Sequence, residues 1–590
     1  MTDSSPTPPF EVLRVGNCSG FYGDRLSAMR EMLEGGPLDV LTGDYLAELT
    51  MLILGRDRAK DPTLGYARTF LRQLEDCLGL ALEKGVRIVA NAGGLNPHGC
   101  ATAVQDLATR LGLDVKVAVV DGDDLTTRAE ELGLGAPLAA NAYLGGLGIA
   151  AACRAGADVV ITGRVTDASV VVGPAIAHFG WERTEFDAIA GAMAAGHVIE
   201  CGTQATGGNL AFFREITDLT RPGFPIAEIR RDGSTVITKH PGTDGAVTVD
   251  TVVSQLLYEV QDARYAGPDA VLRLDSLTLE PEGPDRVLIS GARGEAPPPD
   301  VKVSCTRVGG YRNEMTFVLT GLDIEAKAEL ARRQVEASLP VRPAELTWSL
   351  ARTDHDDPDT QARAAATLTL VARDPDEANV GRAFSNAAVE IALASYPGCF
   401  LTNPPGSGSA YGVYEPRYVA QDVPAHTVTL PSGERHSIGP PPRTQPLEPL
   451  SGDPAAAVAG EAREAGSAAY GMTVRAPLGT IVGARSGDKG GNANVGVWVR
   501  SQDEFAWLDG FLTVARLRDL LPEARDLTVI RTRLPQIRAL NFVVEGLLGE
   551  GVAYAARFDP QAKALGEWLR ARHVDVPTRL LSAPMEGPRP

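Results

Sequence analysis

Residues 86–97 read Val-Arg-Ile-Val-Ala-Asn-Ala-Gly-Gly-Leu-Asn-Pro, an apolar run with strand character that stops at a loop of small polar residues. The same pattern occurs five times within the first 170 residues. Stretches of helical composition separate the runs, which predicts βα units and a parallel sheet. The other four pairs of run and loop are 12–15 with 16–25, 38–41 with 42–44, 115–120 with 121–124, and 157–161 with 162–167.

The loops that follow the strands of a parallel sheet share one edge of it, and ligands bind at that edge. We therefore expect the loops 17–25, 42–44, 91–97 and 162–167 to contribute polar side chains to a single site.

Composition excludes several classes of protein. The chain has 56 basic and 75 acidic residues and a net charge of −19, which argues against a nucleic-acid surface or an anionic membrane as partner. It does not exclude a small anionic ligand, because the local field of a loop can oppose the net charge. Seven cysteines without a CxxC pair predict a reducing, cytoplasmic location and no zinc site.

No segment reads as a signal or a membrane span. Met1–Pro9 is polar and rich in proline, unlike a secretory signal. The most apolar window, 142–162, is interrupted by Arg154 and Asp158, and we interpret it as a packed helix followed by a buried strand.

At 590 residues the chain is too long for one core, and we divide it into three domains. A parallel α/β domain is expected at 10–215, an α+β domain with an antiparallel sheet at 216–450, ending in a proline-rich linker, and a compact α+β domain at 476–575. In the middle domain we expect strands at 301–308, 315–319, 346–351 and 366–372, with a turn at Gly309-Gly310, and helices at 324–337 and 377–395. In the last domain we expect strands at 480–485, 494–500 and 527–532, and helices at 504–521, 537–548 and 560–572.

The stretch 484–494, Ala-Arg-Ser-Gly-Asp-Lys-Gly-Gly-Asn-Ala-Asn, is the sharpest motif. Its glycines permit a nest of backbone N–H groups for an anion. Lysine is rare in this chain, with 8 against 48 arginines, so a lysine in a glycine-rich loop suggests a specific role. The alternative is a solvated hairpin. The candidates are Asp488 and Lys489 for acid–base chemistry and Arg485, Ser486, Asn492 and Asn494 for substrate binding.

The first loop is the second candidate. Ser19, Gly20 and Gly23 could expose N–H groups to phosphate, while Asp24 and Arg25 would cap the next helix. The binding candidates of this loop are Asn17, Ser19, Gly20, Asp24 and Arg25. The loop matches neither GxGxxG nor a Walker motif, so it implies no nucleotide. A plain turn between strand and helix is the alternative.

Two further loops carry polar groups that suit carbonyl or carboxylate oxygens. Arg164 offers a fork for a carboxylate, with an internal Arg164–Asp167 ion pair as the alternative. The loop after residue 90 offers amides and a backbone nest, with a glycine-rich turn as the alternative. The binding candidates of these two loops are Asn91, Gly93, Gly94, Asn96, Arg164 and Thr166.

We expect general acid–base function from Asp44, Asp167 or Glu200. The acidic run at 121–124 could suggest Mg²⁺, but a solvated acidic turn is favoured because no matching ligand set stands elsewhere. Cys201 near His197 resembles a nucleophile with its base, yet a buried inert cysteine is favoured. The sequence contains no nicotinamide, flavin or metal motif.

Together, the loops 16–25, 91–97, 162–167, 200–209 and 485–494 resemble those of the acyclic terpene utilisation family, in the expected order along nearly the whole chain. The resemblance implies a long N-terminal unit and a ferredoxin-like C-terminal domain. It also implies a role in growth on citronellol or geraniol, whose breakdown runs through acyl-CoA intermediates.

We therefore expect a homo-oligomeric enzyme of acyl-CoA or branched-acid catabolism, a lyase, hydratase or hydrolase with non-redox acid–base chemistry and a CoA thioester as substrate. The alternative is a non-catalytic acyl-CoA-binding or assembly subunit of a carboxylase or lyase. A carboxylate with a strongly perturbed pKa in the site would favour the enzyme, and a lining of neutral amides would favour the binder.

Overall fold

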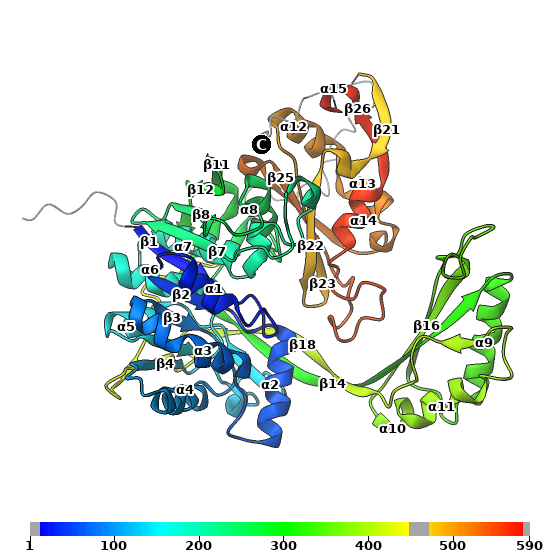
Figure 1. Ribbon diagram of the computed structural model, residues 1–590, viewed down its shortest axis with the longest axis horizontal. Helices are drawn as coiled ribbons and strands as arrows, with labels where there is room; N and C mark the ends of the chain where they lie inside the picture. Colours follow the sequence, from blue (N-terminus) through cyan, green and yellow to red (C-terminus); the bar gives the residue numbers. More distant parts are fainter. Residues whose placement is uncertain (1–11, 448–470, 582–590) are drawn as a thin grey trace, which may run out of the picture. The chain divides into compact units, whose positions relative to one another are not determined.

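The computed structural model describes residues 12–447 and 471–581 (Figure 1). The polar, proline-rich stretch 1–9 and most of the Ala/Gly/Glu-rich run of the expected linker lie outside these residues. The described chain forms two compact units. The second comprises Arg307–Val413 and Ala553–Pro560, and the first comprises the remainder.

The first unit contains an eleven-stranded sheet with the order β11-β12-β8-β7-β1-β2-β3-β6-β4-β19-β20. Its central five strands are β1 (Val12–Asn17), β2 (Val40–Gly43), β3 (Arg87–Ala90), β6 (Val159–Thr162) and β4 (Val117–Asp121). Every neighbouring pair among these five is parallel. Their carboxyl ends therefore lie on one edge of the sheet, which confirms the predicted arrangement of the loops.

Helices cover both faces of this sheet, because its strands alternate apolar side chains between two cores. In β6, Val159 and Ile161 point into one core and Val160 into the other. The first core includes α1, α3 and α4, and the second includes α5, α6 and α7 (Figure 1). The helices of this unit are α1 (Ala28–Gly35), α2 (Glu48–Lys60), α3 (Arg68–Lys84), α4 (Pro97–Leu111), α5 (Leu147–Arg154), α6 (Ser169–Phe179), α7 (Phe186–Ile199) and α8 (Val249–Leu256).

Antiparallel strands extend the sheet on both sides, so it continues past residue 215 and includes residues of the expected linker. The domain ranges 10–215, 216–450 and 476–575 themselves stay a prediction. The added strands are β7 (Pro225–Arg230), β8 (Thr235–Lys239), β11 (Thr278–Gly283), β12 (Arg286–Ser290), β19 (Thr427–Thr429) and β20 (Arg435–Ser437), and a separate sheet holds β9 (Arg264–Ala266), β10 (Val271–Arg273) and β13 (Arg293–Glu295).

The predicted turn at Gly309-Gly310 is wrong, because one strand, β14 (Asp300–Thr320), runs through both glycines. β14 changes partner at this point: residues before it pair with β5 (Ala139–Ala142), and residues after it pair with β16 (Ala365–Asp374). A side chain at Gly309 would collide with the ring of Tyr411, 2.5 Å away, so the glycine serves a close approach rather than a turn.

The second unit is an antiparallel sheet with three helices. The sequence predicts the antiparallel sheet and the helix at 324–337, but the single helix expected at 377–395 forms two shorter helices, at 377–380 and 382–390. Arg373 lies over the ring of Tyr554, 3.7 Å from its centroid, which fixes the inserted segment 553–560 within this unit. Its further elements are α9 (Ile324–Ser338), β15 (Glu345–Ala351), α10 (Glu377–Val380), α11 (Arg382–Glu390), β17 (Phe400–Leu401) and β18 (Ser409–Ala420), the last continuing into the first unit.

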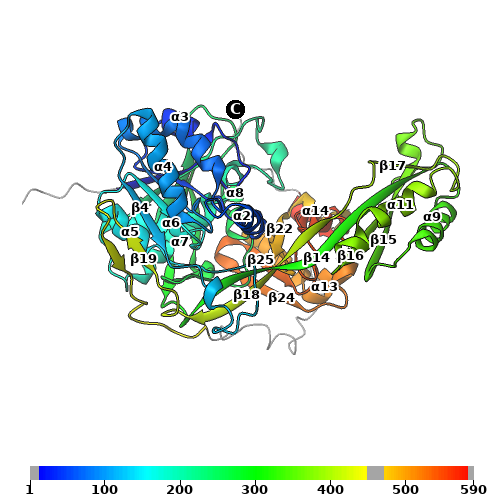
Figure 2. The ribbon, with the colours of Figure 1, turned by 90° about the horizontal axis from the view of Figure 1, so that it is seen from below.

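The C-terminal part of the first unit holds a four-stranded antiparallel sheet, β22-β23-β25-β24 (Figure 2). The predicted helix at 537–548 is wrong, because half of this stretch forms β25, whose six residues are all buried. The elements are β21 (Thr473–Pro477), β22 (Gly483–Lys489), β23 (Asn492–Trp498), α12 (Gln502–Phe511), α13 (Val514–Leu520), β24 (Val529–Leu534), β25 (Ala539–Val544), α14 (Leu565–Ala571), β26 (His573–Pro577) and α15 (Thr578–Leu581).

Trp498 docks this part against α8. Its ring is 1% exposed within the core that contains α5–α7, and its Nε1 donates to Asp250 Oδ1 at 2.7 Å.

We expect Trp498→Ala to cost about 3–5 kcal/mol of stability, because it leaves a cavity at this junction. Urea unfolding followed by circular dichroism measures the loss. Trp568→Ala, at a partly buried ring, should cost clearly less, and equal losses would contradict a docking role for Trp498.

Candidate functional site

The end of β1 is tied to the end of α7 by the side chain of Asn17. Its Oδ1 accepts from the Ser19 N–H at 2.7 Å, and its Nδ2 donates to the carbonyl oxygen of Glu200 at 3.2 Å. Asn17 is fully buried. The first loop thus fixes the position of Glu200, although the two residues are far apart in the sequence.

Asp44 and Asn91, at the ends of the next two strands, form a buried pair. Asn91 Nδ2 donates to Asp44 Oδ1 at 2.6 Å, and Asn91 Oδ1 accepts from the Tyr45 N–H at 2.7 Å. Burial raises the pKa of Asp44 well above its ordinary value, and the charge of Asp167 adds to this effect. Asp44 therefore favours its protonated form.

Arg164 carries a buried positive charge at the end of β6. Its backbone N–H donates to Asp123 Oδ2 and its Nη1 to Asp167 Oδ1, both at 2.8 Å, and its guanidinium lies 4.3 Å from the centre of the Tyr143 ring. Burial opposes the charge, but Asp167, Tyr143 and Asp44 together outweigh it, and the pKa of Arg164 is raised. The internal Arg164–Asp167 pair weighed from the sequence is therefore present.

His197 and Glu200 form a second pair at the end of α7. His197 Nδ1 and Glu200 Oε1 are hydrogen-bonded at 3.0 Å, and the imidazole packs on the ring of Tyr265 with 4.6 Å between centroids. Burial lowers the pKa of His197 to about 4, with Lys489 contributing, and burial raises that of Glu200 well above its ordinary value, with Asp167 and Glu259 contributing. His197 is therefore neutral near pH 7, and Glu200 favours its protonated form.

Several polar atoms around this pair lack a hydrogen bond of normal geometry. Glu200 Oε2 and His197 Nε2 are buried without one, although the backbone of Gln255 faces the imidazole. Gln255 itself is 1% exposed, and both its amide oxygen and its amide nitrogen are unpaired. Because buried polar groups are nearly always satisfied, these atoms mark a place for a polar ligand group or water.

The motif at 485–494 is a β-hairpin whose turn is Gly490-Gly491, and it lies against this part of the same chain. Arg485 donates to the Gln204 side chain and lies 4.1 Å from the centre of the Tyr258 ring. The ammonium of Lys489 lowers the pKa of both His197 and Glu200, so it lies near them. Burial raises the pKa of the adjacent Asp488 to about 6.

Other candidates from the sequence hold loops in place. Asp24 accepts from the N–H groups of Gly20 and Arg25, and Asn96 caps α4 by accepting from the Gly99 N–H. A side chain at Gly93 would lie 2.5 Å from the Thr162 carbonyl oxygen, and Gly94 has a left-handed φ of 51°. The remaining contacts of this kind are Ser19 to Phe21, Arg25 to Glu31, Thr166 to Ser169, Ser486 to Lys563, Asn492 to Gly546 and Asn494 to Asn541.

Sequence reasoning missed Tyr143, Glu259 and Tyr265 and undervalued His197 and Asp123. The spacing of His197 and Glu200 at i and i+3 on a helix was an available signal that both face one way. The prediction of a solvated acidic turn at 121–124 is wrong for Asp123, which is only 2% exposed. Its buried carboxyl group has partners, because Oδ2 accepts hydrogen bonds from the side chain of Asn141 and from the backbone N–H of Arg164. Burial raises the pKa of Cys201, so its thiol favours the protonated form, and its inertness stays a prediction.

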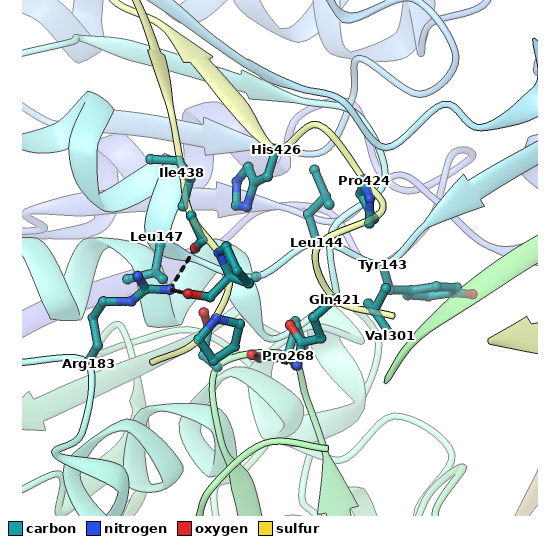
Figure 3. Close-up of a pocket in the computed structure, with 15 residues that line it drawn as sticks. Tyr143, Leu144, Leu147, Arg183, Pro268, Val301, Gln421, Pro424, His426 and Ile438 are labelled. Atoms are coloured by element: carbon teal, nitrogen blue, oxygen red, sulfur yellow. Dashed lines mark hydrogen bonds between the residues drawn. The ribbon is translucent and has the colours of Figure 1, made fainter. Parts of the chain in front are cut away.

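A small cavity lies beside Tyr143 (Figure 3). It holds about 30 Å³, room for roughly one water molecule, and is therefore too small for an organic substrate. Arg183 closes one side by donating to the carbonyl oxygens of Gly439 and Pro440 at 2.8 and 2.9 Å. Burial lowers the pKa of His426, on the opposite side, to about 4.

Within residues 12–447 and 471–581, no three His, Cys, Asp or Glu side chains are grouped so as to hold a metal ion. None of the helices in these ranges is both long and apolar enough to cross a bilayer.

The chain matches two protein families along most of its length. Residues 13–430 match the model of the acyclic terpene utilisation family protein AtuA, and residues 476–575 match the AtuA ferredoxin-like domain. The chain belongs to the acyclic terpene utilisation family. Membership implies involvement in acyclic terpene utilisation, and it makes the C-terminal part that carries Lys489 a ferredoxin-like domain. No curated protein and no solved structure matches the chain.

The pKa of Asp123 predicts how this family member responds to pH. Burial raises that pKa to about 7, so between about pH 4 and pH 7 the folded protein binds a proton that the unfolded chain releases. Stability then falls as pH rises, by up to about 1.4 kcal/mol per pH unit from this group. Melting temperatures of Asp123→Asn should decline less over this range. As a control, Asp61→Asn, at an exposed position, should show the same dependence of melting temperature on pH as the parent protein. If Asp123→Asn also shows the parent's dependence, Asp123 is ionised in the folded protein.

Proposed function

We propose that the protein is an enzyme that acts on an acyl-CoA or a branched carboxylic acid by acid–base chemistry without a redox cofactor. The observation that carries this proposal is Glu200, a buried carboxyl with a raised pKa and an unpaired Oε2, beside a neutral imidazole and the Lys489 ammonium. A raised carboxyl pKa in a site that also holds fixed cations is typical of a general acid.

These groups suit a substrate whose reaction places negative charge on a carbonyl oxygen. A base such as Asp167 would take the proton from the carbon next to a thioester carbonyl, and the electron pair would move to the oxygen. Glu200 would donate a hydrogen bond or its proton to that oxygen, and the ammonium of Lys489 would stabilise the charge. Arg164 would hold a substrate carboxylate or the carbonyl, and Asp44 would supply a second proton.

The second candidate is a non-catalytic acyl-CoA-binding or assembly subunit of a carboxylase or lyase. This binding role would be favoured if only neutral amides surrounded the unpaired atoms of His197, Glu200 and Gln255. Two buried carboxyls with raised pKa values, Asp44 and Glu200, favour the enzyme, because binding alone does not require protonated acids. Incubation with a panel of acyl-CoAs, with products followed by mass spectrometry, distinguishes the two.

Glu200→Gln should lower turnover of the substrate found in that panel by about 10²–10⁴-fold, because the amide keeps the shape but cannot donate a proton. Steady-state kinetics measures the loss. Glu228→Gln is a matched control, since Glu228 is also buried but pairs with Arg14 and Arg286 on the sheet. Full activity of Glu200→Gln would remove the general acid from the proposal.

Lys489→Met should abolish turnover or ligand binding without unfolding the protein, because the methionine keeps the apolar stem and loses the charge. Turnover, calorimetric binding and the melting temperature are measured together. Lys327→Met, on α9 of the second unit, is the control and should retain activity. If Lys489→Met turns over like the parent protein, the hairpin serves only to dock the ferredoxin-like domain.

A further inference from the structure

The segment between α8 and β9 is where the ferredoxin-like domain meets the site. Tyr258 packs on Gly487, where a side chain would lie 2.5 Å from its ring. The backbone N–H of Glu259 donates to Asn494 Oδ1 at 2.9 Å, and Asn541 Nδ2 donates to the carbonyl oxygen of Val260 at 3.1 Å. Two asparagines of that domain thus hold the backbone on either side of this point.

Glu259 is strained at this position. Its φ of 57° lies in the left-handed region, which costs free energy for a residue with a Cβ and none for glycine. Short polar residues tolerate this conformation best, and Asn209, Asp285, Asp323 and Asp357 adopt it elsewhere in the described chain, as do Arg538 and Ala562. Glutamate has no such advantage, so stability alone would favour glycine or asparagine here.

The side chain of Glu259 acts electrostatically on the groups of the site. Its charge acts on groups from four parts of the chain, which are His197, Glu200, Cys201, Tyr258, Tyr265 and Asp488. Strain that persists at such a place is more often part of a mechanism than an accident.

We propose that Glu259 is a positioning residue for Glu200: Asn494 of the ferredoxin-like domain holds the backbone of Glu259 beside the site, so that docking of this domain and the proton on Glu200 depend on one another. This inference concerns the same site as the proposed function, and the role of Glu259 in catalysis rests on that function. Because coupling between two equilibria is reciprocal, whatever displaces Asn494 also weakens the hold of Glu200 on its proton.

Other charges also act on Glu200, and they set the size of the effect. Burial and Asp167 favour the proton more than Glu259 does, while Lys489 and Arg164 oppose it. Removing Glu259 should therefore lower the pKa of Glu200 without returning it to its ordinary value. The titratable groups that face Glu200 are Asp44, Arg164, Asp167, His197, Cys201, Glu259, Tyr265 and Lys489.

The test measures the proton on Glu200 directly and needs no substrate. Infrared spectra of the full chain are recorded against pH, and the protonated carboxyl band of Glu200 is assigned by its loss in Glu200→Gln. In Glu259→Gln the midpoint of that band should move to lower pH by about one unit, because a negative neighbour is gone. Asn494→Ala should move it in the same direction, because Glu259 loses its anchor.

Glu259→Gly is the second variant, and it separates strain from charge. It should show the same shift of the band while its melting temperature is at least as high as that of the parent protein, because glycine adopts the left-handed conformation freely. An unmoved band in Glu259→Gln and Glu259→Gly overturns the inference, and a shift in these but not in Asn494→Ala overturns the role of the ferredoxin-like domain. A shifted band without turnover of any acyl-CoA leaves the inference standing and removes the proposed function.

Discussion

A carboxyl group that leaves water must either pair with a cation or keep its proton, and this constraint organises the whole site. Asp167 takes the first course by pairing with Arg164 at 2.8 Å. Asp44 and Glu200 take the second, since burial raises both pKa values. Among these three acids, Asp167 has a cationic partner, whereas Asp44 and Glu200 favour their protonated forms.

The parallel register of five short strands is what brings these groups together. Asn17, Asp44, Asn91 and Arg164 each stand at or just after the end of a strand, and the strands are hydrogen-bonded neighbours. This part of the fold and of the site could be predicted from the sequence, because an apolar run followed by a polar loop is a local pattern. Strand order was not needed, since every order of parallel strands places the same ends on one edge.

The errors share a physical cause. The stretch 537–548 holds a short apolar run that fits a buried helix or a buried strand equally well, and only its pairing with two neighbouring strands decides for β25. Gly309-Gly310 looks like a turn by composition, yet it marks the point where one long strand changes partner. In both cases the deciding contacts come from residues distant in the sequence.

The site has a similar limit. Tyr265 and Glu259 carry no local signal, because a tyrosine at the start of a strand and a glutamate after a helix are common. Their importance comes from packing on His197 and from the hydrogen bond to Asn494. Lys489 could be singled out because a chain that uses arginine almost throughout kept a lysine there, but its neighbours could not be named.

The hairpin explains why so many polar residues are concentrated in one turn. Asn492 and Ser486 hold the ferredoxin-like domain together, while Asn494 and Arg485 join it to the segments at 259 and 204. The charge of Lys489 lowers the pKa values of His197 and Glu200, the buried pair at the end of α7. Since the lysine is placed by the same strands that dock the domain, the charge near Glu200 depends on docking.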